Sequence, residues 1–293
     1  MKPRRLGDIS LARILEREEP AFVATQLIPN ATPEALAPYR QWLEPRALDP
    51  ASGLFILPVQ TYVVRTRHHN ILIDACLGED KTTRWHMPWH KMKGLTFLRD
   101  LAALGLAPAD IDYVMCTHLH GDHIGWNTRL VDGRWVPTFP KARYVMSRAE
   151  VDYCRNFNKT ASAEVYEECI DESVLPVVEA GRAVLIGGDF ALDDEVSIDP
   201  LPGHTLGHYG VHLRSGGEEA VMIGDLMHSP VQCAEPDWHA GSDLDPALAR
   251  QSRRRFLEWA AETRHLVLTA HFPSPSIGHI KRQGAAFRFD YSE

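Results

Sequence analysis

Four side chains that can bind metal ions lie within the segment Thr117–His123, directly after an apolar run that is typical of a buried strand. They are His118, His120, Asp122 and His123. Alternate residues of an extended segment point to the same side, so His118 and His120 could bind one ion. Gly121 permits a tight turn, after which Asp122 and His123 could face a second ion. Surface histidines in a polar loop are the ordinary alternative, but three imidazoles and a carboxylate this close together favour a metal site.

A single segment cannot complete the coordination shells of two ions, so further ligands are expected at the ends of other strands. Three residues late in the chain each follow an apolar run and a small residue. They are His204, Asp225 and His271. Taken singly, a histidine at a strand end is more often a hydrogen-bonded structural residue, and a Gly-Asp pair is more often a turn. Their order after the first segment favours a shared metal site.

The identity and order of these seven residues resemble the metallo-β-lactamase superfamily, and the likeness extends from about Val59 to the C-terminus. An aspartate at position 225, where other members have a cysteine, resembles the dinuclear hydrolases in which a carboxylate bridges the metals. The segments Gly224–His228 and His271–Ile280 are similar to those of methyl parathion hydrolases and related lactonases. The resemblance implies an α+β fold, a four-layer αβ/βα sandwich, with residues 1–293 in a single domain.

The same resemblance implies how the ligands divide between two divalent ions. One ion is bound by His118, His120 and His204. The other is bound by Asp122, His123 and His271, and Asp225 bridges the two. Zinc is the default metal, although histidine and carboxylate sites also accept manganese, cobalt or iron. A hydroxide between the metals is the implied nucleophile, because two ions lower the pKa of a shared water and polarise a carbonyl or phosphoryl oxygen.

Three residues receive catalytic roles: the bridging Asp225, Asp122 as a group that accepts and returns a proton, and His228 as a group that orients the substrate or the leaving group. Many N-acyl-homoserine-lactone lactonases have a tyrosine three residues after the bridging aspartate, and His228 occupies that position here. The substrate contacts of this chain are therefore expected to differ from theirs.

Several other residues are expected near the site. Metal-bound histidines usually donate their second ring N–H to an acceptor, and Asp74 at the end of an apolar strand is the candidate, with a strand-end turn as the alternative. The segment Trp85–His90 could form an apolar wall or lid, pack on a core or mediate dimer contacts. Trp126 and Phe272 follow predicted ligands and are candidates for the pocket wall. The chain also has two other histidines after glycines, which are expected to be structural or to support ligands: His208 and His279.

The resemblance predicts a hydrolase that acts on a lactone or another ester, with side activity on organophosphate triesters. One alternative is a β-lactam or amide hydrolase. Another is a non-hydrolytic metal or redox protein of the same fold, but the diiron members of that kind have a glutamate in place of one histidine of the first segment. Homodimers are common among relatives, so a homodimer is a further expectation.

Composition agrees with a small-molecule enzyme. The chain has 293 residues, a hydrophobic fraction of 44% and a formal net charge of -8, which argues against nucleic acid or an anionic membrane as the main partner. It contains no apolar run of the length that a membrane helix requires and no signal-peptide core, so a cytoplasmic protein is predicted. Five scattered cysteines without a Cys-x-x-Cys pair indicate buried, reduced thiols.

The elements that must position these residues form two β-rich halves. The strands predicted in the first half are Thr61–Thr66, Ile71–Ile73, Tyr113–Cys116 and Ala142–Met146. Those in the second half are Ala183–Ile186, Val196–Asp199, Tyr209–Leu213, Val221–Ile223 and His265–Leu268. The predicted helices are Leu95–Leu104, Ser147–Phe157, Ala163–Ile170 and Pro246–Thr263, the last with Asp245 as its N-cap. Residues 1–50, rich in proline and charge, are expected to wrap the surface.

Overall fold

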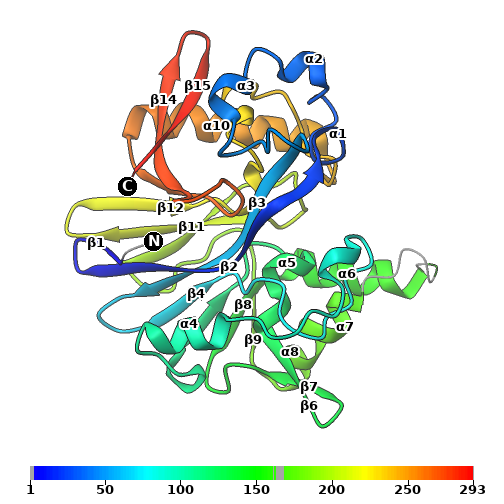
Figure 1. Cartoon of the computed structure of the whole chain (residues 1–293). Coiled ribbons are helices and arrows are strands. Elements are labelled where there is room, and N and C mark those ends of the chain that lie inside the picture. The colour runs from blue at the N-terminus through cyan, green and yellow to red at the C-terminus, as the bar shows by residue number, and fades with distance from the viewer. Residues whose placement is uncertain (1–2, 161, 163–167, 293) are drawn as a thin grey trace. The chain divides into compact units, whose positions relative to one another are not determined.

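The computed structural model describes residues 3–160, 162 and 168–292 (Figure 1). The chain divides into two compact units, each made of separate stretches of sequence. The N-terminal unit contains Lys2–Glu16 and Val59–Phe190, and the C-terminal unit contains Arg17–Pro58 and Ala191–Glu293. In the part of the chain that the structure describes, no helix combines the length and the apolar character needed to span a membrane.

A seven-stranded sheet has the order β1-β2-β3-β4-β5-β8-β9. Its strands are β1 (Arg4–Leu6), β2 (Ile9–Val23), β3 (Leu54–Arg65), β4 (Asn70–Ile73), β5 (Tyr113–Met115), β8 (Arg143–Ser147) and β9 (Ala183–Ile186). The pairs β4-β5, β5-β8 and β8-β9 are parallel, and β3 and β4, which contain the predicted strands Thr61–Thr66 and Ile71–Ile73, pair antiparallel. Three of the four residues of β4, Ile71, Leu72 and Ile73, are apolar and have no exposed surface, as expected for a strand covered on both faces.

The helices of the N-terminal unit lie between its strands along the chain. They are η1 (Met87–Trp89), α4 (Phe97–Ala103), η2 (Pro108–Asp110), α5 (Gly121–Ile124), η3 (Gly125–Asn127), α6 (Arg148–Thr160), α7 (Glu168–Ser173) and α8 (Leu175–Glu179). A small hairpin of β6 (Thr128–Val131) and β7 (Arg134–Pro137) adds a separate two-stranded sheet. Helices α4 and α6 confirm two predictions. The predicted helix Ala163–Ile170 lies mainly outside the described residues, and its last three positions belong to α7.

A six-stranded sheet in the C-terminal unit follows chain order from β10 to β15. Its strands are β10 (Val196–Pro200), β11 (Tyr209–Ser215), β12 (Glu218–Met222), β13 (Leu266–Leu268), β14 (Ile277–Gln283) and β15 (Ala286–Tyr291). Only β12 and β13 pair in parallel within this sheet, since all its other pairs are antiparallel. The loops that follow β10, β12 and β13 contain the predicted ligands of this unit.

Helix α10 (Pro246–Thr263) is the longest helix among the described residues and has the predicted ends. The side chain of Asp245 accepts hydrogen bonds from two backbone N–H groups of the first turn, at 3.1 and 3.0 Å. Pro246 occupies the first helical position, where its missing N–H costs nothing. The inner face of α10, with Phe256 and Leu257, packs in an apolar core against residues of the six-stranded sheet such as Val267 and Phe287.

The segment that composition assigns to a surface wrap is more ordered than predicted. Ile9–Val23 forms β2, a long strand within the seven-stranded sheet. This strand was not predicted because its sequence contains charged residues. One of them, Glu16, accepts hydrogen bonds from the backbone N–H of Leu77 and the indole N–H of Trp126, at 2.8 and 2.6 Å. The rest of the segment forms α1 (Ala24–Leu27), α2 (Pro33–Leu36) and α3 (Arg40–Leu43), and α9 (Val231–Ala234) and η4 (Gly224–Leu226) complete the C-terminal unit.

Candidate metal centre

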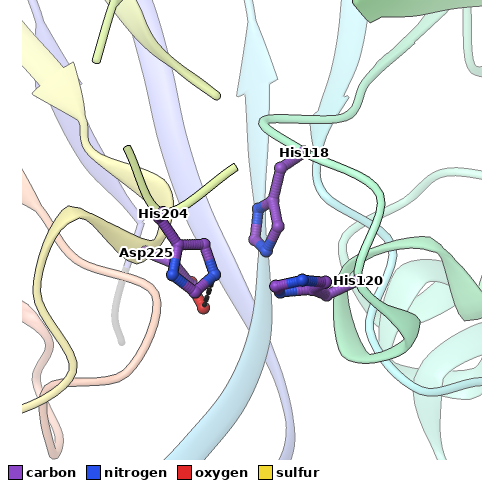
Figure 2. Close-up of side chains that lie close together, drawn as sticks. All are labelled: His118, His120, His204 and Asp225. Carbon is purple, nitrogen blue, oxygen red and sulfur yellow. Dashed lines mark ion pairs between the residues drawn. The ribbon is translucent and has the colours of Figure 1, made fainter. Parts of the chain in front are cut away.

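The N-terminal unit holds His118, His120, Asp122 and His123, the N-terminal ligand group, on the loop that follows β5 and on α5. The imidazoles of His118 and His120 meet edge to face with ring centroids 4.6 Å apart (Figure 2), and the ring of His123 lies 4.2 Å from that of His118. His120 occupies the N-cap position of α5, and the N–H of His123 donates to its carbonyl at 3.0 Å. The backbone therefore brings three imidazoles and one carboxylate together within this unit.

Asp74 fixes this loop through three hydrogen bonds. Its carboxylate is 2.8 Å from Nδ1 of His123 and accepts bonds from the backbone N–H and the hydroxyl of Thr117, at 2.8 and 3.0 Å. Asp74 has no exposed surface, and its own N–H donates to the carbonyl of Met115. The predicted role of Asp74 as an acceptor for a candidate ligand is confirmed.

The glycine that this loop requires is a different one from that predicted. Gly121 has no positive φ and begins α5, and a Cβ there would make only ordinary contact, 3.5 Å from the indole nitrogen of Trp85. Gly125 is the restricted position, because a Cβ there would lie 1.8 Å from the carbonyl oxygen of Leu77. The close approach allows the N–H of Gly125 to donate to the carbonyl of Cys76 at 2.7 Å. The loop is therefore held by the close backbone approach of Gly125 to Cys76 and Leu77, called the glycine clamp below, and not by a turn at Gly121.

The C-terminal unit holds His204, Asp225, His228 and His271, the C-terminal ligand group. Asp225 lies in η4 and is approached by three imidazoles. Its carboxylate oxygens are 3.4 Å from Nε2 of His204 (dashed in Figure 2), 3.0 Å from Nε2 of His228 and 3.1 Å from Nε2 of His271. The rings of His228 and His271 stack at 5.5 Å, and all four residues are buried. Three of these residues, Asp225, His228 and His271, offer ligand atoms that all lie within 4.8 Å of one another.

The outer nitrogens of two of these imidazoles contact oxygen acceptors. Nδ1 of His204 is 2.9 Å from a carboxylate oxygen of Asp243, and Nδ1 of His271 is 2.9 Å from the carbonyl oxygen of Pro58. His208 supports the group from behind, because its Nε2 accepts the N–H of Asp225 at 2.9 Å while its Nδ1 donates to the carbonyl of Leu201. The other histidine expected to be structural, His279, contacts backbone carbonyls near the end of α10.

Asp243 is a functional residue that sequence reasoning missed. It lies in a polar loop before α10, 39 residues from His204, where an aspartate reads as a turn or capping residue. Burial opposes its ionisation, but the hydrogen bond from His204 and the positive charges of His204, His228 and Arg253 hold the pKa of its carboxyl below the ordinary value. Asp243 is thus a carboxylate that can orient the ring of His204.

The donor set fits divalent metal ions. Four imidazoles place Nδ1 against an oxygen of Thr117, Asp74, Asp243 or a backbone carbonyl, and they belong to His118, His123, His204 and His271. Metal-ligating histidines make this contact with the nitrogen that does not bind the ion, because it fixes the tautomer and the ring orientation. Imidazole nitrogens with carboxylate oxygens are ligands that zinc prefers.

Three aromatic residues near the ligands have different environments. Trp126 is buried and stacks on Phe97 at 5.2 Å, and Phe272 has no exposed surface and packs on Phe289. Both are core residues, so their prediction as pocket walls is wrong. In the segment Trp85–His90, which contains η1, Trp89 is buried, but Trp85 is 52% exposed and lies against Gly121 of the ligand loop.

Comparisons with known proteins agree with this arrangement of elements. Residues 55–271 match the family model described as the metallo-beta-lactamase superfamily. An N-acyl homoserine lactonase from Bacillus sp is 24% identical over 229 residues, which cover 74% of this chain and 82% of that relative.

Two solved structures resemble the whole chain at 22% sequence identity. The dizinc quorum-quenching lactonase AidC, in complex with the product N-hexnoyl-L-homoserine, has a TM-score of 0.80 and a match that covers 100% of this chain and 97% of that chain. The hydrolase AbOPH of the beta lactamase superfamily has a TM-score of 0.82, with 99% and 98% covered. The predicted fold class, with mixed α/β structure and two sheets, is therefore confirmed, and the chain belongs to the metallo-beta-lactamase superfamily.

Proposed function

We propose that the two ligand groups together bind two divalent metal ions, zinc by default, and that the protein hydrolyses lactones or other esters. The proposed ligands of one ion are the three imidazoles and the carboxylate drawn in Figure 2, namely His118, His120, His204 and the bridging Asp225. The proposed ligands of the other ion are Asp122, His123, His271 and the same Asp225. This division follows the family pattern, and each ligand group supplies part of each shell.

One observation carries the proposal: the imidazoles of both groups present the same nitrogen. Nδ1 of His123 and Nδ1 of His204 each contact a buried carboxylate, and Nδ1 of His271 contacts a carbonyl oxygen. A core histidine that only fills space also needs a partner for its polar nitrogens. Unrelated core histidines, however, would not be expected to use Nδ1 for this contact in each of several separate loops. A set of rings with Nδ1 anchored and Nε2 directed toward other candidate ligands is expected of a metal centre.

Two divalent ions, when bound, would make a shared water nucleophilic at neutral pH and polarise the carbonyl under attack. The residues of the chain have supporting tasks. The carboxylate of Asp225 is in contact with three imidazoles, and Asp225 would be the ligand shared by the two ions. The carboxylate of Asp122 is 12% exposed and 3.6 Å from Nε2 of His123, so it can accept a proton and return it to the leaving group. His228 contacts Asp225, and its proposed role is to orient the substrate.

Relatives support a lactone as the substrate. The curated relatives include N-acyl homoserine lactonases from several Bacillus species, and one solved structure with the same fold contains the hydrolysis product N-hexnoyl-L-homoserine. Activity on organophosphate triesters is a secondary proposal, which rests on the resemblance of Gly224–His228 and His271–Ile280 to methyl parathion hydrolases. Both electrophiles are attacked by the same nucleophile, so one centre can serve both.

The residues present favour a hydrolase over a redox protein. A β-lactam or amide hydrolase remains the second candidate among hydrolases, since it uses the same kind of centre. A redox protein of the diiron type is disfavoured by His118, His120 and His123, because such proteins have a glutamate at one of these positions.

The test is metal analysis followed by a substrate panel. We expect about two ions per chain, as the dinuclear pattern requires. The metal-loaded protein is then assayed on lactones, aryl esters, phosphotriesters and the β-lactam nitrocefin, with Asp225→Ala as the inactive control. Turnover of lactones that is absent from the control supports the proposal. Full activity without bound metal would end it, and turnover of nitrocefin alone would favour the β-lactam alternative.

A further inference from the structure

A single arginine lies behind the C-terminal ligand group. Arg253, in the middle of α10, has no exposed surface and is among the largest fully buried side chains. Its guanidinium donates to the carbonyl oxygens of Leu226, Pro236 and Trp238, at 3.0, 3.1 and 2.6 Å. Its Nη2 is 3.5 Å from a carboxylate oxygen of Asp243. All of these partners are in the C-terminal unit.

The contact with Asp243 connects Arg253 to one candidate ligand. One oxygen of the Asp243 carboxylate faces Arg253 and accepts the N–H of Ala240 at 2.9 Å, and the other is 2.9 Å from Nδ1 of His204. The guanidinium faces this carboxylate on one side, and the backbone N–H of Ala240 fixes its position. The ring of His204 is oriented by a carboxylate that Arg253 in turn holds in place.

Two further contacts connect Arg253 to the other side of the same group. Leu226, whose carbonyl accepts from Arg253, directly follows Asp225 in η4. The carbonyl of Trp238 accepts from both Arg253 and the amide of Gln232, whose oxygen accepts the N–H of His228 at 2.7 Å. One side chain is thus connected to three members of the C-terminal ligand group. It reaches His204 through the ion pair with Asp243, Asp225 through the carbonyl of the next residue, and His228 through the hydrogen bonds of Trp238 and Gln232.

We propose that Arg253 is a positioning residue that sets the orientation of His204 and Asp225 for metal binding. The inference rests on the proposed function, because it gives these two residues the role of ligands. Nothing in the core packing of α10 requires a charge at this position, since the neighbouring inward residues Phe256 and Leu257 are apolar. Burying a charge is costly, and an apolar residue of similar volume often serves stability as well or better.

The geometry of the guanidinium explains why arginine occupies this site. Its planar head has five donors in a fixed fork, so it can contact three carbonyls and a carboxylate that lie in different directions. An ammonium at position 253 has three donors on a flexible stem and can satisfy only part of this set. A lysine is therefore expected to restore some of the function that an apolar side chain loses.

The test compares the wild-type holoprotein with Arg253→Met, Arg253→Lys and Asp243→Asn. The matched control is Arg254→Met, which removes the adjacent arginine on the exposed face of α10, where it pairs with Asp237. Zinc affinity is measured by competition with a chromophoric chelator. The visible spectrum of the cobalt-loaded protein reports the coordination geometry, and kcat and KM are measured separately on a lactone. A role in packing alone would change thermal stability without changing the cobalt spectrum.

We expect Arg253→Met and Asp243→Asn to weaken the binding of at least one zinc ion about 10- to 100-fold and to alter the cobalt spectrum. Arg253→Lys should fall between Arg253→Met and the wild type, kcat should fall more than KM rises, and Arg254→Met should match the wild type. A folded Arg253→Met with unchanged zinc affinity and cobalt spectrum overturns the inference.

Asp243→Asn decides the matter if Arg253→Met does not fold, because this variant keeps the three carbonyl contacts of Arg253, removes the negative charge that faces it and places an NH2 group against either Ala240 or His204. Unchanged zinc binding in Asp243→Asn then overturns the inference. Failure of the proposed function has a different signature: a wild-type protein that retains no zinc sinks both proposals. If the wild type binds two ions but zinc affinity and the cobalt spectrum are unchanged in the variants, only the role of Arg253 is wrong.

Discussion

Asp74 and His123 are joined by a contact of 2.8 Å between a carboxylate oxygen and Nδ1, with almost no exposed surface on either side chain. The contact holds the ring of His123 in one orientation and one tautomer, with Nε2 as the nitrogen for a ligand. The same carboxylate accepts two bonds from Thr117, so one aspartate determines the start of the ligand loop and the orientation of one of its rings.

Replacing Asp74 with asparagine should therefore weaken metal binding. The amide keeps one acceptor oxygen but presents an NH2 group to donors that now contact a carboxylate, and we expect zinc affinity to fall about 10- to 100-fold. Asp112→Asn is the control, since Asp112 precedes β5, the strand before the ligand loop, and its carboxylate accepts the backbone N–H of Asn70. Chelator competition on both variants measures the difference. Equal affinities in Asp74→Asn and the wild type would show that the contact does not matter for metal binding.

The glycine clamp beneath the ligand loop gives a prediction about stability. A Cβ at Gly125 would lie 1.8 Å from the carbonyl oxygen of Leu77, so Gly125→Ala must displace backbone and should lower the unfolding free energy by about 1–3 kcal/mol or more. Gly121→Ala is the matched control, because its methyl group would meet Trp85 at an ordinary distance of 3.5 Å. Denaturant unfolding of both metal-free variants measures the two effects. Similar losses would contradict the assignment of the clamp.

The helices and strands of the fold were predictable where local signals decide them. Asp245 and Pro246 mark the start of α10 because a side-chain acceptor and a proline suit the first turn of a helix, and the observed helix begins there. Strand β4 could be predicted because three of its four residues, Ile71–Ile73, form an apolar run. Strand β2 could not be predicted, because it contains charged residues whose partners are distant along the chain. Glu16, for example, has partners 61 and 110 residues away.

The candidate site divides in the same way. The proposed ligands could be predicted because several ligand types follow strands within short segments. Residues that hold these ligands came from elsewhere: Asp243 and Arg253 have no local signal and are recognised only by their contacts. Phe272 was predicted to line the pocket because it follows the proposed ligand His271. Successive residues of an extended segment point to opposite sides, so Phe272 instead packs in the core.

The buried Lys81 should give stability a distinct pH dependence. Its ammonium group contacts Thr128 at 2.6 Å and the ring of Trp135 at 3.5 Å, but burial lowers its pKa from 10.5 to about 7. Between these values the unfolded chain binds more protons at this site than the folded chain. The contribution of Lys81 to the unfolding free energy therefore rises with pH above about 7, with a slope of at most about 1.4 kcal/mol per pH unit.

Comparison with Lys81→Met isolates this contribution, because the other groups that titrate in this range are common to both proteins. The wild type should gain stability relative to Lys81→Met as the pH increases from 7 to 9 in denaturant unfolding at fixed ionic strength. Lys93→Met, which removes a largely exposed amine, should show no such trend relative to the wild type. A difference between wild type and Lys81→Met that stays constant with pH would mean that Lys81 keeps an ordinary pKa.

His228 separates substrate recognition from metal binding. Its Nε2 is 3.0 Å from the carboxylate of Asp225, and among the described residues its buried Nδ1 has no hydrogen-bond partner, so this nitrogen is available to a bound substrate. We expect His228→Ala to keep about two ions while the ratio of kcat/KM between lactones and aryl esters changes about 10-fold or more, as when one hydrogen bond to a substrate is lost. His279→Ala, which removes a histidine near the end of α10, is the control. Because Asp225, His228 and His271 are also close enough to share an ion, metal analysis of His228→Ala is essential. Loss of one ion would make His228 a ligand and would end its assignment as a substrate contact.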